Sequence, residues 1–310
     1  MSEPRMAWIA EDPATIAVVE LARKVAETST TLLITGESGT GKDLLARLIH
    51  ELGPRRDAPF LKIDCASLPQ ELVESELFGH ERGAFTGAVE RKLGRLEMAQ
   101  GGTIVLDEVA ALSPATQSKL LRVLEERQFE RLGGTETITI DARLVALTNS
   151  DLGRLVSGGQ FREDLFFRLS VLTISVPALR ARPADILPLA DALLERAARV
   201  HGRADAVFSE PARRMLQAYG WPGNVRELKN SIERALVFST GPMLEPRDFP
   251  ESVQIADSGL GVALRSLEDL ERDAIRATLE ATHYKIGKSA AILGISRKTL
   301  LDKRKKYGLN

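Results

Sequence analysis

Eight residues, GESGTGKD, have the composition and spacing of a loop that binds phosphate groups. Glycines allow consecutive backbone N–H groups to surround phosphate oxygens, and the lysine near the end of such a loop reaches the β- and γ-phosphates. The apolar run LLIT precedes the loop and the amphipathic run LLARLIHEL follows it, so the loop joins an expected strand to an expected helix. We therefore predict nucleotide binding by Gly36, Glu37, Ser38, Gly39, Thr40, Gly41, Lys42 and Asp43.

Further along the chain, the apolar run TIVLDE ends in two adjacent acids. In phosphoryl transfer, an aspartate at the end of a strand holds Mg²⁺ and a neighbouring acid polarises the attacking water. The residues predict an ATP-hydrolysing site in which Asp107 is the metal ligand and Glu108 activates water. One position departs from the usual loop: Asp43 stands where a serine or threonine hydroxyl would bind Mg²⁺.

Two arginines are candidates for neutralising the charge that develops on the transferred phosphate. Phosphoryl transfer depends mainly on positioning and charge neutralisation, so further cations are expected near the site. Arg162 and Arg168 lie six residues apart in FREDLFFRL, just before the apolar run VLTISVP. The alternative is that they are surface arginines near a helix.

Five short apolar runs must supply the frame that positions these residues. They cover residues 31–36, 59–64, 103–108, 142–149 and 171–177, and amphipathic helical patterns lie between most of them. This alternation predicts an α/β fold with a parallel sheet and helices on both faces. We expect an α/β subdomain over 1–180, an α-helical lid over 181–250, a linker over 251–264 and a small all-α domain over 265–310.

Composition is that of a soluble globular chain, with 310 residues, 44% hydrophobic and 27% charged. No apolar run approaches the roughly 20 residues that span a membrane, so we expect a cytoplasmic protein without a membrane partner. The single cysteine, Cys65, excludes an intrachain disulfide and fits a reducing compartment. We expect it to be a small buried packing residue.

Basic residues are concentrated near the end of the chain, although the net charge is only −1. The segment IGKSAAILGISRKTLLDKRKKYG fits a helix-turn-helix, in which Gly294 makes the turn. Arg297, Lys298 and Thr299 open the second helix and are best placed for base edges, while Lys303 would neutralise phosphates. The alternative is an amphipathic helical hairpin with a solvated basic face.

An aromatic residue stands in a flexible segment that lies between the glycine-rich loop GESGTGKD and the acidic pair of TIVLDE. The segment GAFTGA comprises Gly83, Ala84, Phe85, Thr86, Gly87 and Ala88. None of these side chains is an effective acid, base or nucleophile, since Thr86 has no evident partner base. A mobile loop with one aromatic anchor suits a contact formed in one nucleotide state and withdrawn in another. The alternative is a loop phenylalanine that folds back onto the core.

Five motifs in this order and spacing resemble one family, the bacterial enhancer-binding AAA+ activators of sigma-54 RNA polymerase. They are GESGTGKD, ELFGHERGAFTGA, GGTIVLDEV, FREDLFFRL and GWPGNVREL. The resemblance covers about residues 15–250, and residues 265–310 are similar to the Fis-type helix-turn-helix domain that ends these activators. GAFTGA is the most specific of the motifs. An acidic residue at the Asp43 position is usual in the family.

The resemblance implies an AAA+ P-loop sheet sandwich with a helical lid, ATP and Mg²⁺ as cofactors, and a hexameric ring as the active form. It implies that Asn149 senses the γ-phosphate, that Arg162 and Arg168 reach the neighbouring subunit's site, and that Arg226 is a second sensor. Phe85 and Thr86 would grip sigma-54 in the RNA polymerase holoenzyme. The terminal domains would pair as dimers on enhancer DNA, and the whole would remodel the closed promoter complex.

Three departures from the family pattern affect these expectations. The family usually has asparagine where this chain has Asp64, so two carboxylates, Asp64 and Glu108, would repel each other or share a proton or cation. We nevertheless include Asp64 among the catalytic candidates. WIAEDPAT replaces a glycine-containing segment expected to contact adenine. The pattern also leads us to expect no receiver or ligand-sensing domain before the ATPase, in which case control would be in trans or by a regulatory domain that has been removed.

Two other functions stay open on the sequence alone. One is a DNA-binding regulator whose ATPase is weak or vestigial, which Asp64 keeps in consideration. The other is a different AAA+ machine, such as a helicase loader or a protease unfoldase. On the sequence alone, only the GAFTGA segment distinguishes a sigma-54 activator from such other AAA+ machines.

Overall fold

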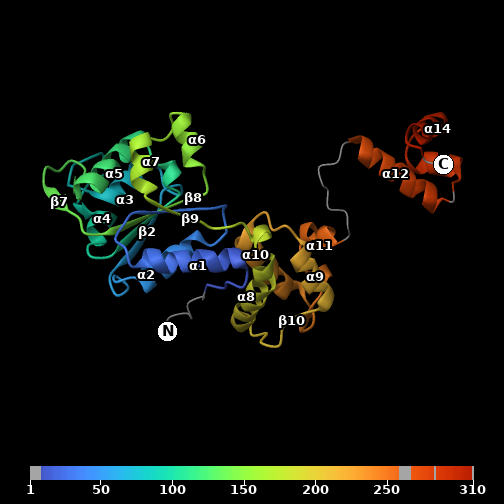
Figure 1. The fold of residues 1–310 in the computed structure, drawn as a ribbon, viewed down its shortest axis with the longest axis horizontal. Coiled ribbons are helices and arrows are strands. Elements are labelled where there is room, and N and C mark those ends of the chain that lie inside the picture. The colour runs from blue at the N-terminus through green and yellow to red at the C-terminus, as the bar shows by residue number, and fades with distance from the viewer. Residues whose placement is uncertain (1–7, 258–266, 283, 309–310) are drawn as a thin grey trace. The chain divides into compact units, whose positions relative to one another are not determined.

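The computed structural model describes residues 8–257, 267–282 and 284–308 (Figure 1). The chain divides into two compact units, residues 1–254 and 255–310. Within the described ranges, no helix has the length and apolar character needed to cross a lipid bilayer.

A five-stranded parallel sheet forms the centre of the first unit. Its strands are β1 (Leu32–Thr35), β2 (Phe60–Asp64), β5 (Thr103–Asp107), β8 (Arg143–Thr148) and β9 (Leu172–Ser175), in the order β2-β5-β8-β1-β9. The five predicted apolar runs form these five strands, which confirms the predicted parallel sheet. Because all strands are parallel, their carboxyl ends meet at one edge, where β1, β5 and β8 deliver the phosphate loop, Asp107 and Asn149.

Helices cover both faces of the sheet, as Figure 1 shows. On one face, α1 (Pro13–Ala26) and α2 (Lys42–Leu52) pack on Ile34, Val105 and Leu147. On the other face, the alternate residues Leu33 and Leu106 contact a second set of helices. These are α3 (Gln70–Phe78), α4 (Arg95–Met98), α5 (Pro114–Glu126), α6 (Leu152–Ser157) and α7 (Glu163–Leu169). Alternation of buried residues along each strand thus explains why two layers form.

Two small antiparallel ribbons extend from the α3–α5 side of the sheet. One pairs β3 (Gly79–His80) with β4 (Lys92–Leu93), and the other pairs β6 (Gln128–Glu130) with β7 (Thr137–Thr139). A bridge between His80 and Leu132 joins the two ribbons. The short turn η1 (Val109–Ala111) follows β5. The GAFTGA segment lies between β3 and β4, so the second ribbon supports its base.

A helical lid completes the first unit, as expected. Its helices are α8 (Ile186–Val200), α9 (Glu210–Ala218), α10 (Asn224–Phe238) and α11 (Glu251–Asp257), with the short turns η2 (Leu179–Ala181), η3 (Pro183–Asp185) and η4 (Pro246–Asp248) and the two-residue strands β10 (Val207–Phe208) and β11 (Met243–Leu244). Trp221 is fully buried in its core and its indole N–H donates to the Leu216 carbonyl at 2.8 Å.

The segment predicted as a linker over 251–264 differs from that prediction in its first part. Residues 251–257 form helix α11, and Val253 is buried in the lid core. Only one of the described side chains of this helix is fully buried, so its sequence has the weak hydrophobic patterning that is typical of a linker. The other predicted linker residues, 258–264, lie outside the described residues.

The second unit contains three helices in its described part: α12 (Leu267–Ala281), α13 (Ile286–Ile292) and α14 (Arg297–Lys306). Ile275, Leu279, Ala290 and Leu300 form its small core. Gly294 adopts φ +66° between α13 and α14, a conformation that glycine adopts without steric cost. These helices confirm the predicted helix-turn-helix.

Candidate nucleotide site and the surfaces around it

The phosphate loop runs from the end of β1 into the first turn of α2. Gly36, Gly39 and Gly41 have positive φ values of 145°, 78° and 105°. At its centre, the Lys42 ammonium donates to the carbonyl oxygens of Gly36 at 2.7 Å and Glu37 at 3.1 Å. Burial lowers the pKa of Lys42, although nearby carboxylates oppose the shift. The loop therefore holds the lysine inside a ring of backbone groups, as a phosphate site requires.

A cavity of about 520 Å³ opens beside this loop and brings together residues far apart in the sequence. Its lining includes Asp64 from β2, Asp107 from β5, Glu108 directly after β5, Asn149 after β8 and Arg226 from the lid. The loop residues Ser38 to Asp43 line it as well. The structure thus places most of the predicted nucleotide-site residues around one cavity large enough for a small ligand.

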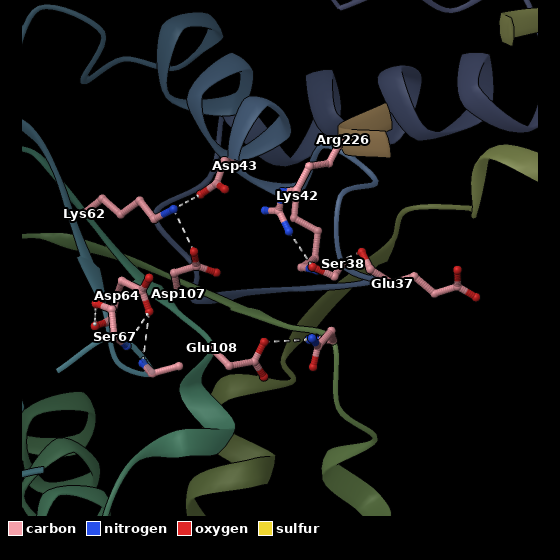
Figure 2. A network of polar contacts seen from close by, with 12 residues as sticks. Glu37, Ser38, Lys42, Asp43, Lys62, Asp64, Ser67, Asp107, Glu108 and Arg226 are labelled. Carbon is pink, nitrogen blue, oxygen red and sulfur yellow. Dashed lines mark hydrogen bonds and ion pairs between the residues drawn. The ribbon is translucent and has the colours of Figure 1, made fainter. Parts of the chain in front are cut away.

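Glu108 has an unusual backbone conformation at the end of β5. Its φ of 54° and ψ of 56° lie in the left-handed region, which a non-glycine residue adopts at a cost of about 1 kcal/mol or more. The Thr148 hydroxyl donates to its carboxylate at 2.7 Å, and the backbone N–H of Asn149 donates at 3.3 Å. The Ser150 hydroxyl adds a weaker contact. The end of β8 therefore fixes this carboxylate, as Figure 2 shows for part of the network.

The predicted sensor Asn149 contacts Glu108 through its backbone. Its side-chain Oδ1 accepts a hydrogen bond from the Ser150 hydroxyl at 3.2 Å. The residue lines the cavity.

Asp64 is held by its own loop. Its Oδ1 accepts hydrogen bonds from the backbone N–H groups of Ala66 at 3.0 Å and Ser67 at 3.1 Å. We expected repulsion or a shared proton or cation between Asp64 and Glu108. Within the described residues the two carboxylates have separate partners and no hydrogen bond joins them. Asp64 therefore acts locally as a turn-capping side chain.

Cys65 follows Asp64 and is only 2% exposed. Burial, and after it the charges of nearby carboxylates, raises the pKa of its thiol to about 12. It is a packing residue of the sheet, as predicted.

Lys62 joins two acids of the site and was not identified from the sequence. Its ammonium lies 2.5 Å from Asp43 Oδ1 and 2.7 Å from Asp107 Oδ2 (Figure 2). Burial alone would lower the pKa of Lys62, but hydrogen bonds to Asp107 and Asp43 outweigh burial and raise it. Lys62 lies two residues before Asp64 on β2, so both side chains emerge on the same face of the sheet. That alternation was the signal available in the sequence.

The lid contacts the phosphate loop directly through the first turn of α10. Arg226 donates from Nη1 to the Ser38 hydroxyl at 2.8 Å, and the backbone N–H of Val225 donates to the Gly39 carbonyl at 3.0 Å. An added Cβ on Gly39 would lie 2.5 Å from the Gly223 carbonyl oxygen. The loop and lid are therefore in close backbone contact, and the predicted second sensor meets the loop.

Asn224 connects the lid to the loop through several hydrogen bonds and was not among the predicted residues. It is fully buried with a φ of +53°. Its Oδ1 accepts from the Leu179 N–H at 2.7 Å, and its Nδ2 donates to Glu37 Oε2 at 3.1 Å and the Ser38 carbonyl at 3.0 Å. The preference of asparagine for left-handed backbone and for local hydrogen bonds was the available signal.

An ion pair adds to the contact between loop and lid. Arg180 Nη2 lies 2.5 Å from Glu37 Oε1. The hydrogen bond from Arg180, and after it that from Asn224, lowers the pKa of Glu37 to about 2. The carboxylate is therefore fully ionised at neutral pH.

The N-terminal segment meets the same region through a buried polar network. Arg182, 2% exposed, donates to the Thr40 carbonyl at 2.7 Å. The buried Asp185 accepts from the backbone N–H of Asp12 at 2.8 Å and the hydroxyl of Thr15 at 2.5 Å. Trp8 lines the cavity, and an added Cβ on Gly41 would lie 3.4 Å from its ring. The segment WIAEDPAT thus supplies an aromatic wall beside the loop.

Arg162 and Arg168 lie away from their own chain's cavity. Arg162 is exposed and pairs with Asp164 at 2.7 Å, while Arg168 lies 3.8 Å from Glu125. Neither side chain lines the 520 Å³ cavity. The structure therefore does not bring these two predicted residues to the site within one chain.

The GAFTGA segment forms a compact turn in which Gly83 N–H donates to the Ala88 carbonyl at 2.8 Å. Phe85 is 40% exposed, and its ring lies edge-on to the His80 ring with centroids 5.0 Å apart. The other side of His80 is fixed, since its Nδ1 is 2.8 Å from the Ser75 hydroxyl. Phe85 thus rests on one ring while much of its surface faces solvent.

Arg131 joins the base of this segment to the second ribbon. Its buried guanidinium pairs with Glu97 at 2.7 Å, Glu81 at 2.9 Å and Glu136 at 3.0 Å. The hydrogen bond to Glu97 raises the pKa of Arg131 against the opposing effect of burial. An added Cβ on Gly133 would approach Ala84 to 2.8 Å, so the two loops touch.

The predicted DNA-contacting residues occupy different environments on α14. Arg297 and Lys298 are exposed in its first turn, where the Arg297 guanidinium packs beside Gly287. Thr299 donates its N–H to the Ser296 hydroxyl at 3.0 Å, which caps the helix. Lys303 instead pairs with Glu271 of α12 at 2.5 Å. The first turn therefore presents its charges more openly than Lys303 does.

Comparisons with known proteins match the chain almost from end to end. Residues 8–175 match the family described as the Sigma-54 interaction domain. Residues 180–261 match the AAA+ ATPase lid domain, and residues 266–307 match the Fis family of bacterial regulatory proteins.

Curated relatives and solved structures agree with these matches. The nitrogen fixation protein VnfA of Azotobacter vinelandii is 46% identical over 95% of this chain, which spans 58% of that relative's length. The transcriptional regulatory protein ZraR of Klebsiella oxytoca is 44% identical over 95% of the chain and 68% of its own. The regulatory protein AtoC of Escherichia coli is 42% identical, and the match covers 97% of this chain and 68% of AtoC.

Among solved structures, NtrX from Brucella abortus in complex with ADP has a TM-score of 0.76 and 34% identity, covering 98% of this chain and 70% of that one. The same protein in complex with ATP has a TM-score of 0.74 and 35% identity over 98% and 70%. The nucleotide-loop geometry, the lid, the helix-turn-helix and these matches agree, and the chain belongs to the family of sigma-54-dependent transcriptional activators, with an AAA+ domain and a Fis-type DNA-binding domain.

Proposed function

We propose that this chain hydrolyses ATP in a ring of identical subunits and uses the energy to remodel the closed complex of sigma-54 RNA polymerase at promoters. The observation that carries the proposal is one cavity that contains Lys42, Asp107 and Glu108 beside the phosphate loop. The NtrX structures with ADP and ATP support binding of an adenine nucleotide in this fold.

The donors around the cavity fit Mg²⁺. Mg²⁺ in nucleotide sites is bound by one or two carboxylates together with phosphate oxygens, and Asp107 lines the cavity next to the loop that would hold the phosphates. When bound, Mg²⁺ would supply charge neutralisation at the phosphates. Asp43 is a second carboxylate nearby, on the first turn of α2.

Hydrolysis requires a base whose carboxylate is fixed in direction. Glu108 has this property, because Thr148 and Asn149 hold its oxygens from the end of β8. We propose that it orients the attacking water and receives its proton. Lys42 would bind the β- and γ-phosphates, and Arg226 would join the bound nucleotide to the lid.

The two arginines of FREDLFFRL support a shared site between subunits. Arg162 and Arg168 are exposed and lie outside their own chain's cavity, so we propose that they act on the neighbouring subunit's nucleotide. A ring, which we propose to be a hexamer, would place them there. Such arginines contribute roughly 10³- to 10⁵-fold to hydrolysis in other nucleotide hydrolases.

The GAFTGA segment is proposed as the surface that binds sigma-54. Phe85 is part-exposed on a turn tied through Glu81 to the Arg131 network. A change at the nucleotide could therefore reach this turn through the sheet and Glu97. The Fis-type domain would hold the ring at enhancer DNA, as paired dimers, through Arg297, Lys298 and Thr299.

Phosphate release tests the ATPase part of the proposal. The wild-type chain, assayed at increasing protein concentration, should hydrolyse ATP, and Glu108→Gln should lower turnover by roughly 10²- to 10⁴-fold while nucleotide binding persists. Equal loss of binding and turnover in Glu108→Gln would show a structural defect instead. A wild type with no turnover at any concentration would favour the alternative, a DNA-binding regulator with a vestigial ATPase.

Open-complex formation at a sigma-54 promoter tests the remodelling part. We expect opening with ATP and none with a non-hydrolysable analogue. Phe85→Ala is the matched variant, which should keep ATP hydrolysis and lose opening. Opening that proceeds equally well with the analogue contradicts the proposal.

A further inference from the structure

Lys62 occupies a position that the family motifs do not explain. It lies on β2, the edge strand of the sheet, and its side chain is 36% exposed. An ammonium at such an edge could extend into water at no cost. Instead it reaches two carboxylates from different elements, Asp43 on α2 and Asp107 at the end of β5 (Figure 2).

The two contacts of Lys62 are short. Nζ lies 2.5 Å from Asp43 Oδ1 and 2.7 Å from Asp107 Oδ2. Holding a lysine in one geometry costs side-chain entropy. Attraction between one ammonium and two carboxylates offsets this cost, because in the described part of the chain no other ion pair is made by either carboxylate. Charge therefore determines where the side chain lies.

Asp107 is also the carboxylate proposed to bind the divalent cation. A carboxylate that already receives a short ammonium hydrogen bond has much of its charge neutralised. A cation approaching Asp107 must therefore compete with the Lys62 ammonium. Asp43 offers Lys62 a second partner, so the lysine can leave Asp107 without losing every contact.

We propose that Lys62 is an internal counter-cation of this site, which neutralises Asp107 and Asp43 before a divalent cation binds and leaves Asp107 when the metal and nucleotide enter. The inference rests on the proposed function, because it takes Asp107 as a metal ligand. Lys62 is thus a positioning residue that acts through Asp107 and sets how strongly nucleotide binding depends on metal.

This role predicts that Lys62→Met weakens nucleotide binding in the absence of metal and strengthens metal binding. Without metal, the variant leaves two carboxylates without their cation beside the phosphate loop, so a nucleotide should bind more weakly. With metal, the competitor for Asp107 is gone, so the metal should bind more tightly. A purely structural role for Lys62 would weaken both.

The test uses the full chain, fluorescently labelled ADP and Mn²⁺ as the probe metal. We expect Lys62→Met to weaken ADP binding in EDTA about threefold and to lower the Mn²⁺ concentration for half-maximal binding about fivefold, the size expected for one part-exposed ion pair. Electron paramagnetic resonance of free Mn²⁺ measures the second value directly. Lys62→Gln repeats the neutral substitution, and Lys62→Arg should stay close to wild type.

Lys119→Met is the matched control, because Lys119 also pairs with a carboxylate, Glu74, and is distant in the sequence from the phosphate loop. It should leave both values unchanged. A Mn²⁺ midpoint in Lys62→Met within twofold of wild type, or a shift of both values in one direction, would overturn the inference. A wild type that fails to bind ADP with Mn²⁺ would instead overturn the proposed nucleotide site.

Discussion

The ring of Phe85 rests edge-on against the ring of His80, with centroids 5.0 Å apart and ring planes at 68°. An edge-to-face pair contributes about 0.5–1.5 kcal/mol beyond its buried area. Since Phe85 is 40% exposed, this contact is a main restraint on the ring. Removing it should increase the fraction of molecules with a freely projecting Phe85.

His80→Leu should therefore keep ATP hydrolysis within about threefold and bind sigma-54 about two- to tenfold more tightly without nucleotide. Pull-down with and without a transition-state analogue measures this. Ser75→Ala controls for loss of the hydrogen bond to His80. Weaker binding in His80→Leu would mean that His80 presents Phe85 to its partner.

Asp64→Asn tests whether the carboxylates of Asp64 and Glu108 are coupled. The amide oxygen of asparagine can still accept the N–H groups of Ala66 and Ser67, so the loop should be retained. Because Glu108 has separate partners, we expect turnover within about threefold of wild type. Steady-state phosphate release checks this. A change greater than tenfold would show that Asp64 and Glu108 act together.

Asn224 provides a matched pair of substitutions for the contact between loop and lid. Asn224→Ala loses three hydrogen bonds and keeps a β-carbon at φ +53°, so it should lower the free energy of unfolding by about 2–4 kcal/mol. Asn224→Gly loses the same bonds without the backbone cost and should be about 1 kcal/mol more stable than the alanine variant. Urea unfolding followed by circular dichroism measures both. Equal stability of the two variants would contradict a backbone contribution.

The depressed pKa of Glu37 predicts a stability effect confined to acid pH. Its pKa is about 2 in the fold and about 4.3 in an unfolded chain. The ionised form is favoured by folding, so its contribution is complete above about pH 5 and is lost as pH falls toward 2. Glu37 is 44% exposed, so solvent screening limits this contribution to about 1 kcal/mol or less.

Glu37→Gln should accordingly lower the thermal midpoint at pH 7, and the difference from wild type should shrink between pH 4.5 and pH 3. Arg180→Met removes the partner and should give the same pH profile. A difference that grows with acidification would contradict the assignment.

Lys298 and Lys303 should differ in their effect on the salt dependence of DNA binding. A lysine that contacts phosphate contributes about one unit to the slope of log affinity against log salt. Lys298 is exposed, whereas Lys303 pairs with Glu271. We propose that the exposed Lys298, in place of the predicted Lys303, contacts phosphate, so Lys298→Met should reduce the slope by about one and Lys303→Met by clearly less. Fluorescence anisotropy over a salt series measures both, and equal slopes would show that Lys303 leaves Glu271 on DNA.

The sheet could be predicted from the sequence because each strand is a short, nearly continuous apolar run. The phosphate loop and the acids of β5 could be predicted because their chemistry requires fixed residue types at fixed spacing. Helix α11 was missed because residues 251–257 carry little hydrophobic periodicity, and among its described side chains only Val253 is buried in the lid core.

The rest of the site arises from contacts between distant segments. Lys62 meets Asp43 and Asp107 only because β2 pairs with β5 and lies within reach of the first turn of α2. Asn224 meets Glu37 only because the lid folds onto the loop, across 187 positions of sequence. Neither pairing follows from residue type or spacing along the chain, since both depend on tertiary packing.

The lid's hydrogen bonds to Ser38, Gly39 and Thr40 have a consequence for dissecting this protein. A fragment ending after β9 would retain the entire GESGTGKD loop yet leave those loop carbonyls exposed to water. Such a fragment would keep the sequence of the loop but lose the lid residues, such as Val225 and Arg226, that line the cavity. Truncations intended to isolate nucleotide binding should therefore end beyond α11, so that the loop carbonyls keep their hydrogen bonds to the lid.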